Sequence, residues 1–351
     1  MHKMLKINRK IISLLYTIQH FAVDGLCTFI IFSTLYKNNE DYAFLIFIIY
    51  NSLAFVTQPF VGLFADKINN HKIILIISVI LLIIGLIFKF NFIISMICIG
   101  IGNAFFHISG GKYVIEKTDN DIISLGIFVS TGATGLVLGQ LFHSNFVLIL
   151  FLLLIIIPFI VIILSIDEEI ISNNERSFNN KKEWLIMILI IILVVFIRSF
   201  VGKVAPANFE KSTLIIILIG VASTLGKALG GVVSRFIGTK LTMIISMVLS
   251  TILLIFGDKF NVLYIIGIMF FNFSMPITLY YINILLKNKV GFAFGLLAGI
   301  LFPGYLLGML YYNELLIKII IAILNILSIL IIVFISNKID KEKMNGIRNS
   351  N

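Results

Sequence analysis

Apolar runs of about twenty residues recur along the whole sequence, and this repetition limits the possible folds more than any other feature. A helix needs about 20 mostly apolar residues to cross the roughly 30 Å of hydrocarbon in a bilayer. Of the 351 residues, 60% are hydrophobic and 13% are charged, whereas an ordinary soluble domain is about 45–50% apolar and about a quarter charged. The sequence therefore predicts an all-α membrane protein.

Polar breaks divide the chain into twelve expected membrane spans. The longest polar segment between spans covers residues 167–183, so we expect an N-terminal six-helix half at 1–166, a linker at 167–183 and a C-terminal six-helix half at 184–351. The approximate spans are 11–36, 42–65, 73–90, 92–115, 122–142, 146–166, 184–207, 212–237, 241–256, 262–286, 291–312 and 315–336.

The distribution of basic residues predicts the orientation of these spans. Nineteen lysines and arginines fall on one side of the twelve spans and five on the other. Because short cytoplasmic loops are enriched in lysine and arginine, both termini and the linker are expected in the cytoplasm of a bacterium, with the spans in its inner (plasma) membrane. The basic residues lie in small groups, which argues against a nucleic-acid partner despite the net charge of +10.

Two loops of the sequence share a pattern, which indicates an internal duplication. In each loop a glycine is followed by a basic residue five places later and by a lysine ten places later, and the two patterns are 168 residues apart. Duplicated halves are typical of transporters, in which one half rocks against the other around a site near the membrane midplane. The residues are Gly62, Lys67 and Lys72 in the first loop, and Gly230, Arg235 and Lys240 in the second.

The first of these loops resembles the loop 2–3 signature of the major facilitator superfamily. The matching residues are Gly62, Asp66, Lys67 and Lys72, while Asn69 replaces a glycine and His71 a basic residue of the family pattern. The resemblance implies a monomeric carrier driven by protons, with a central cavity between two six-helix halves, a small-molecule substrate and no cofactor. It also implies that Asp66, with Lys67 and Lys72, forms polar contacts at the cytoplasmic face that stabilise one state of the carrier.

In the second half Ser234 stands at the acidic position beside Arg235. These polar contacts, which we call the conformational latch, are therefore expected to be asymmetric.

Within the superfamily, residues 20–25 and 102–107 resemble the fosmidomycin-resistance branch of drug exporters, although Ile108 replaces the usual proline. The fifth span also carries the glycine spacing of the drug–proton antiporter motif. An alternative explanation is that these small residues let helices approach closely. They are Gly126, Gly135 and Gly139.

Ionisable residues inside the spans are candidates for function, because each costs about 2.5–3.5 kcal/mol on insertion scales. Asp24 lies 14 residues beyond Lys10, about 21 Å of helix rise, and His20 lies one turn earlier on the same face. These two residues are proton-coupling candidates, the alternative being a structural hydrogen-bonded pair that never titrates.

His107 is a third proton-coupling candidate, because an unperturbed imidazole titrates near neutral pH. Asn103 lies one turn earlier and is a candidate for substrate binding. The alternative for His107 is a hydrogen-bonded packing residue. Its span places His107 toward the cytoplasmic end and Asp24 toward the outer half of the membrane, so the sequence predicts no direct contact between them.

Two cations complete the set of buried candidates. Arg198 lies at the depth of Asp24 in the equivalent span of the other half, where it can hold Asp24 deprotonated, form a structural ion pair with it, or bind an anionic substrate. Lys227 lies too far from the end of its span to reach the membrane surface easily, so we expect it to face the cavity or to be paired.

The sequence also excludes several classes of protein. The spans contain no converging catalytic set and the chain has no phosphate-binding glycine-lysine loop, so neither an enzyme nor an ATP-driven pump is expected. Cys27 and Cys98 lack metal-ligand spacing, and no metal site is expected. The leading hypothesis is a proton-coupled exporter of drug-like or small anionic compounds. The alternatives are an importer of a nutrient or metabolite, or a channel or scaffold.

Overall fold

The protein is a bundle of long, mostly apolar helices, described here in a computed structural model. The structure describes residues 7–166, 181–205, 207, 209–311 and 314–348. Within these residues, eleven helical spans are long and apolar enough to cross a membrane, and a further apolar helix has 17 residues. This confirms the all-α membrane fold that the sequence predicts.

Several spans consist of more than one helical segment. The first nine α-helices and the segments between them are α1 (Arg9–Ile30), η1 (Ile31–Leu35), α2 (Tyr36–Asn38), η2 (Glu40–Tyr42), α3 (Ala43–Asn51), η3 (Ser52–Val56), α4 (Gln58–Ile68), α5 (His71–Ile87), α6 (Phe92–Lys117), α7 (Ile122–Ser130), α8 (Gly132–Leu141) and α9 (Asn145–Leu164). The rest are α10 (Lys181–Val204), α11 (Thr213–Ile237), α12 (Thr239–Phe256), η4 (Gly257–Lys259), α13 (Asn261–Asn272), α14 (Ser274–Leu285), α15 (Val290–Leu310) and α16 (Glu314–Arg348).

The observed helices follow the expected spans closely, with one clear extension. Helix α16 continues to Arg348, beyond the expected end at 336. Residues 337–343 include three lysines and one glutamate and contain no glycine or proline. Lysine and glutamate extend a helix at little cost. The expected linker at 167–183 lies mostly outside the described residues, so the division of the chain at that point stays a prediction.

Asparagine side chains explain the turn between α4 and α5. Asn69 adopts a left-handed conformation (φ 51°) directly after α4, and asparagine tolerates this region better than most other residues with a side chain. This is the position where the superfamily pattern has a glycine, so the substitution keeps the turn. Asn70 then caps α5 by accepting hydrogen bonds from the backbone N–H groups of Lys72 and Ile73.

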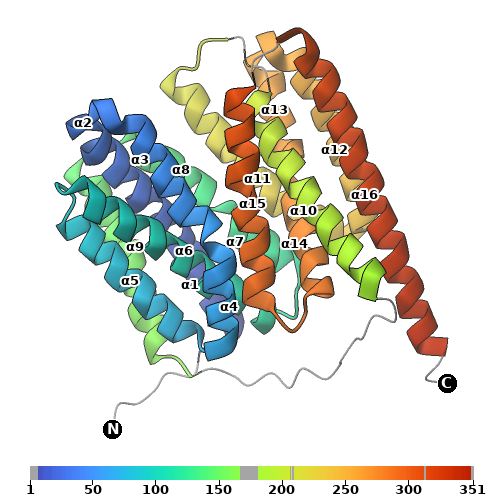
Figure 1. Cartoon of the computed structure of the whole chain (residues 1–351), viewed down its shortest axis with the longest axis horizontal. Helices are drawn as coiled ribbons and strands as arrows, with labels where there is room; N and C mark the ends of the chain where they lie inside the picture. Colours follow the sequence, from blue (N-terminus) through green and yellow to red (C-terminus); the bar gives the residue numbers. More distant parts are fainter. Residues whose placement is uncertain (1–6, 167–180, 206, 208, 312–313, 349–351) are drawn as a thin grey trace.

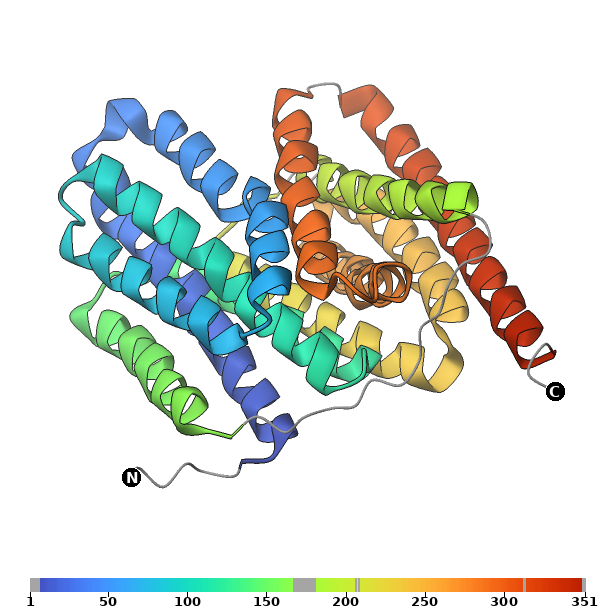
Figure 2. The ribbon, with the colours of Figure 1, turned by 60° about the horizontal axis from the view of Figure 1, so that its bottom comes forward.

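The helices form two groups that meet along two interfaces. Figure 1 shows α1–α9 on one side and α10–α16 on the other. Within the first group α1 packs against α6, α8 and α9, and within the second α10 packs against α15 and α16. Across the groups, α4 packs against α15, and α7 and α8 pack against α11. Figure 2 shows α4 and α15 side by side.

Glycines bring the backbones close together at both of these interfaces. A Cβ atom on Gly62 would overlap the backbone of Gly291, where α4 meets α15. A Cβ atom on Gly231 would overlap the carbonyl oxygen of Ile122, where α11 meets α7. The same offset of 169 residues separates Gly62 from Gly231 and Ile122 from Gly291. The two contacts are therefore related by one common shift along the chain, which is one residue longer than the shift of 168 between the two loop patterns.

The glycines of the fifth span serve close helix packing. A Cβ atom on Gly135 would overlap the carbonyl oxygen of Phe21, and one on Gly139 would overlap that of Gly25, so α8 lies directly on α1. Gly126 lies against the backbone of Lys227 and Gly231 on α11. These contacts account for the three glycines as small residues between helices, and the antiporter-specific meaning of their spacing stays a prediction.

We expect Gly135→Ala to destabilise the protein, because the added methyl group has no space against α1. Overpacking of this kind typically costs about 1–3 kcal/mol. Gly202→Ala is the matched control, since the nearest atom to its Cβ would be an ordinary 3.5 Å away. Thermal unfolding of the two purified variants in detergent should show a lower midpoint for Gly135→Ala alone. Equal midpoints would contradict the close contact between α8 and α1.

Candidate functional site

Asp24 is the centre of a buried polar cluster formed by α1 and α6. Its carboxylate lies 3.3 Å from Nε2 of His20 and 3.7 Å from Nε2 of His107. Asn103 donates a hydrogen bond of 2.9 Å from Nδ2 to Oδ1 of Asp24. The rings of His20 and His107 are perpendicular, with centroids 4.6 Å apart. The structure thus brings together four of the residues that the sequence singled out.

In each histidine of the cluster, Nδ1 also forms a hydrogen bond with a backbone carbonyl oxygen. Nδ1 of His20 lies 2.7 Å from the carbonyl oxygen of Phe128, and Nδ1 of His107 lies 3.0 Å from that of Asn103. These contacts fix the orientation of both rings, so that both Nε2 atoms face Asp24.

The contact between Asp24 and His107 corrects the expectation that the two residues lie at different depths. A side chain in an α-helix tilts toward the N-terminus of its helix. Helices α1 and α6 are the first and fourth spans of the bundle and run in opposite directions, so Asp24 and His107 lean toward each other. Counting residues along each span gives the two Cα atoms different depths in the membrane. The tilt and the length of the two side chains compensate for this difference.

Arg198 on α10 is buried without a counterion. Its side chain has an exposed fraction of 8%, and Nε has no hydrogen-bond partner. Among the described residues no ion pair or hydrogen bond joins the guanidinium to Asp24, so the structure does not show the pairing that was one of the alternatives for Arg198. The partners of Asp24 are the two histidines and Asn103.

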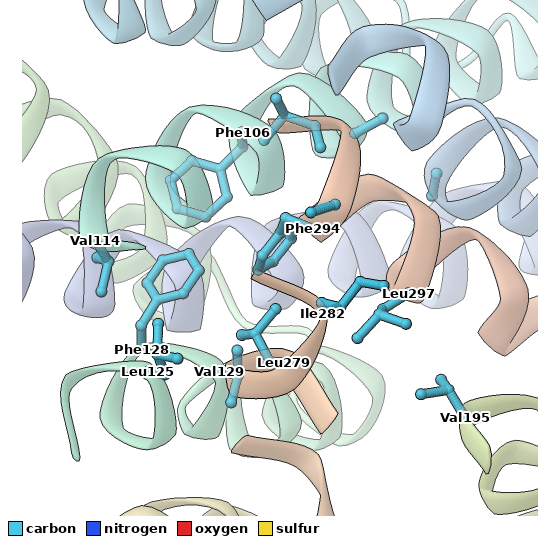
Figure 3. Packing of buried hydrophobic residues seen from close by; sticks show 14 of the residues in the cluster. Phe106, Val114, Leu125, Phe128, Val129, Val195, Leu279, Ile282, Phe294 and Leu297 are labelled. Atoms are coloured by element: carbon cyan, nitrogen blue, oxygen red, sulfur yellow. The ribbon is translucent and has the colours of Figure 1, made fainter. Parts of the chain in front are cut away.

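Arg198 is one of the residues that line a small pocket of about 30 Å³. Thr278 is the other polar residue of the lining, and the remaining walls are apolar. Figure 3 shows five of the apolar lining residues converging from α7, α10, α14 and α15; they are Val129, Val195, Leu279, Phe294 and Leu297. The pocket therefore combines one unpaired cation with a mostly hydrophobic wall.

Lys227 on α11 is a second unpaired cation near this region. Its side chain is half-buried, and no hydrogen bond or ion pair of its ammonium group occurs within the described part of the chain. It lies close enough to Arg198 and Asp24 for the charges to interact. The expectation that Lys227 faces the cavity stays a prediction.

Asp66 joins the two groups of helices at one end of the bundle. Its carboxylate accepts hydrogen bonds from the backbone N–H groups of Gly291 (2.8 Å) and Phe292 (2.9 Å), the first turn of α15. A carboxylate at a helix N-terminus also interacts favourably with the helix dipole. Lys112 of α6 donates a hydrogen bond of 3.1 Å to the same carboxylate. Asp66 thus connects α4, α6 and α15.

The other predicted members of the latch lie outside this contact, except for Gly62, which packs against Gly291. Lys67 and Arg235 are exposed at the same end of the bundle. Lys72 donates a hydrogen bond of 2.5 Å to the carbonyl oxygen of Ser165 and so connects α5 to the end of α9. Their proposed part in a conformational latch stays a prediction.

Sequence reasoning missed two further contacts at this end. Lys112 was counted only as a topology signal, although it is buried and bridges Asp66 and Glu116. Asn120, directly before α7, donates a hydrogen bond of 3.1 Å to the carbonyl oxygen of Tyr280 and accepts one of 3.3 Å from Asn283. A lysine near the end of a span, or an asparagine in a turn, does not indicate from the sequence which distant residues it will contact.

We expect Asp66→Ala to release the N–H groups of Gly291 and Phe292, whereas Lys67→Ala leaves them protected. Hydrogen bonds to charged groups contribute about 1.5–3 kcal/mol each, so amide hydrogen exchange at these two positions should rise about tenfold or more. Mass spectrometry of the peptide that begins α15 measures this exchange. Equal protection in both variants would contradict the role of Asp66 at this helix end.

Comparison with known proteins gives matches to solved structures alone. No family model matches the chain, and no curated protein sequence matches it. Its fold is similar to that of the E. coli fucose:proton symporter, with a TM-score of 0.68 and 13% identity over 92% of this chain and 98% of the symporter. An outward conformation of that major facilitator superfamily transporter gives a TM-score of 0.62 at 11% identity, covering 92% and 99% of the two chains.

A bacterial homologue of the iron transporter ferroportin, in an outward-facing state, is also similar. Its TM-score is 0.60 at 13% identity, and the match covers 94% of this chain and 100% of the homologue. These matches extend over nearly the full length of every chain compared. The protein therefore has the fold of the major facilitator superfamily transporters.

Proposed function

We propose that the protein is a secondary active transporter that exports small organic anions across a bacterial plasma membrane by alternating access, in exchange for protons. Three features support the proposal: the transporter fold, the unpaired cations between the helix groups, and the polar cluster around Asp24. The substrate and the direction of transport are the parts of the proposal that need direct measurement.

The proposal of an anionic substrate rests on the unpaired guanidinium of Arg198. A buried charge is strongly unfavourable unless a partner neutralises it. No side chain among the described residues does so, and the guanidinium borders a pocket. A carboxylate or phosphonate fits the planar fork of an arginine through two parallel hydrogen bonds. The ligand itself then supplies the missing counterion.

The lining of the pocket limits the shape of such a ligand. The pocket has a volume of about 30 Å³ in this state, which is room for a water molecule or two, so a ligand binds there after the surrounding helices move apart. Because the walls are apolar apart from Arg198 and Thr278, a compact anion with a hydrophobic body fits better than a sugar. Lys227, whose charge acts on the same region, is placed to contribute a second favourable interaction with an anion.

The cluster of Asp24, His20 and His107 supports coupling to protons. These groups are the buried carboxylate and imidazoles nearest to the two cations, and residues that load and unload protons in transporters are of this kind. The two short segments that resemble drug exporters are residues 20–25 and 102–107, and they meet at this cluster. Because the two segments that resemble drug exporters come together at this cluster, we favour export over import.

We expect Arg198→Gln to lower transport of a small anion by about tenfold or more, because a hydrogen bond to a charged group contributes about 1.5–3 kcal/mol. Phenylphosphonate is a suitable first probe, since it stays charged and does not cross a bilayer as a neutral acid. Proteoliposomes loaded with the probe report its release. Arg9→Gln is the matched control, because Arg9 is exposed at the start of α1 and does not line the pocket.

An Arg198→Gln protein that folds and releases the probe at the wild-type rate would contradict the anion site. Saturation of the rate with probe concentration separates a carrier from a channel. Other carboxylates and phosphonates with apolar bodies of similar size extend the test if phenylphosphonate is not a substrate.

A proton gradient should control the direction of movement. For exchange of the anion against protons, an acidic exterior drives protons inward, so we expect it to accelerate release of the loaded anion from vesicles with the cellular orientation. Acceleration of uptake under the same gradient would instead support the importer. Indifference of both rates to the gradient would contradict proton coupling.

A further inference from the structure

The strongest unassigned chemistry of the molecule lies in the convergence of His20, Asp24 and His107. One potential ligand atom from each residue lies within 4.8 Å of the other two. Two of these residues come from α1 and one from α6, so the set forms only in the folded bundle. We propose that the three side chains bind a divalent transition-metal ion, with Nε2 of each histidine and the carboxylate of Asp24 as ligands.

The protonation of the two rings points to a cation at the centre. A backbone carbonyl only accepts hydrogen bonds, so Nδ1 of His20 and Nδ1 of His107 each carry the proton that is donated to their carbonyl partners. In a neutral imidazole the other nitrogen then presents a lone pair. Two lone pairs and a carboxylate then face one another, and either a proton on one Nε2 atom or a metal ion at the centre relieves their repulsion.

The spacing of the ligand atoms suits a small metal ion. Two ligand atoms at about 2.1 Å from a tetrahedral ion lie about 3.4 Å apart. Nε2 of His20 lies 3.3 Å from Oδ2 of Asp24, and Nε2 of His107 lies 3.7 Å from Oδ1. One ligand atom from each of the three residues lies within 4.8 Å of the other two, so the side chains have to draw closer together around a bound ion.

The surroundings of the cluster have the features of a metal site. Metal-binding histidines generally donate their other N–H group to a carbonyl or carboxylate, which fixes the ring, and both histidines here do so. Asn103 holds Oδ1 of Asp24 through its amide. Next to the ligands stands Gly132, where a Cβ atom would overlap both Oδ2 of Asp24 and Nε2 of His20. The glycine therefore lets both ligand side chains lie directly against α8.

The ligand set indicates which ions fit. Two imidazoles and one carboxylate suit Zn²⁺, Co²⁺, Ni²⁺ or Fe²⁺, whereas Mg²⁺ and Ca²⁺ prefer sites made of oxygen ligands. Three protein ligands leave at least one position for water or for a bound anion. The Asp24 side chain is 16% exposed, so this open position is within reach of solvent.

Cobalt binding tests the site without any transport assay. Purified full-length protein in detergent, titrated with Co²⁺, should develop visible absorption bands with a stoichiometry of one ion per chain. Zn²⁺ should displace the cobalt, and excess Mg²⁺ should not. His107→Gln should weaken binding by about tenfold or more, as removal of a metal ligand does. His143→Gln is the matched control, because His143 is exposed and distant in the chain from the cluster.

Two additional variants test the site without removing a ligand. Gly132→Ala should block binding by filling the space beside Asp24 and His20, and Lys227→Gln should tighten it by removing a nearby positive charge. Absence of cobalt bands in the wild-type protein at millimolar Co²⁺ would overturn the inference, as would equal binding by the His107→Gln and wild-type proteins. Because the readout is absorption, its failure is distinct from a failure of anion transport.

Discussion

The cost of burying charge in a membrane bundle is the constraint on which the rest of this structure depends. An ionisable group in the hydrocarbon region must be neutralised by protein, water or ligand. The first group of helices does this internally, since Asp24 lies among His20, His107 and Asn103. In the second group, no described residue pairs with Arg198. The two groups therefore differ, because the first holds its buried carboxylate with its own side chains and the second leaves a buried cation for an anion to neutralise.

The same electrostatic reasoning explains how the two groups are held together at one end. Asp66 places a negative charge against the N-terminus of α15, while Lys112 neutralises that charge from α6. Glycines related by one common shift along the chain allow α4 to meet α15 and α7 to meet α11. A few hydrogen bonds and the close packing of small residues thus join the two groups at this end.

The sequence predicted the fold well, because apolar runs and their polar breaks are local features. It also identified Asp24, His20, His107 and Arg198 from the cost of burying them. It did not predict their partners, because the depth and tilt of neighbouring helices depend on packing. Counting residues placed Asp24 and His107 at different depths, and it placed Asp24 at the same depth as Arg198. Lys112 and Asn120 were missed for the same reason, since their partners lie in distant parts of the chain.

The central claim is that the end of the bundle held by Asp66 separates and closes again during the working cycle. The distance between spin labels at positions 67 and 289, both exposed at this end, measures that movement in a protein whose Cys27 and Cys98 are replaced by serine. The account predicts two populations of distances in the reconstituted protein, with the longer population enriched by Asp66→Asn. A single distance that the substitution leaves unchanged would contradict it.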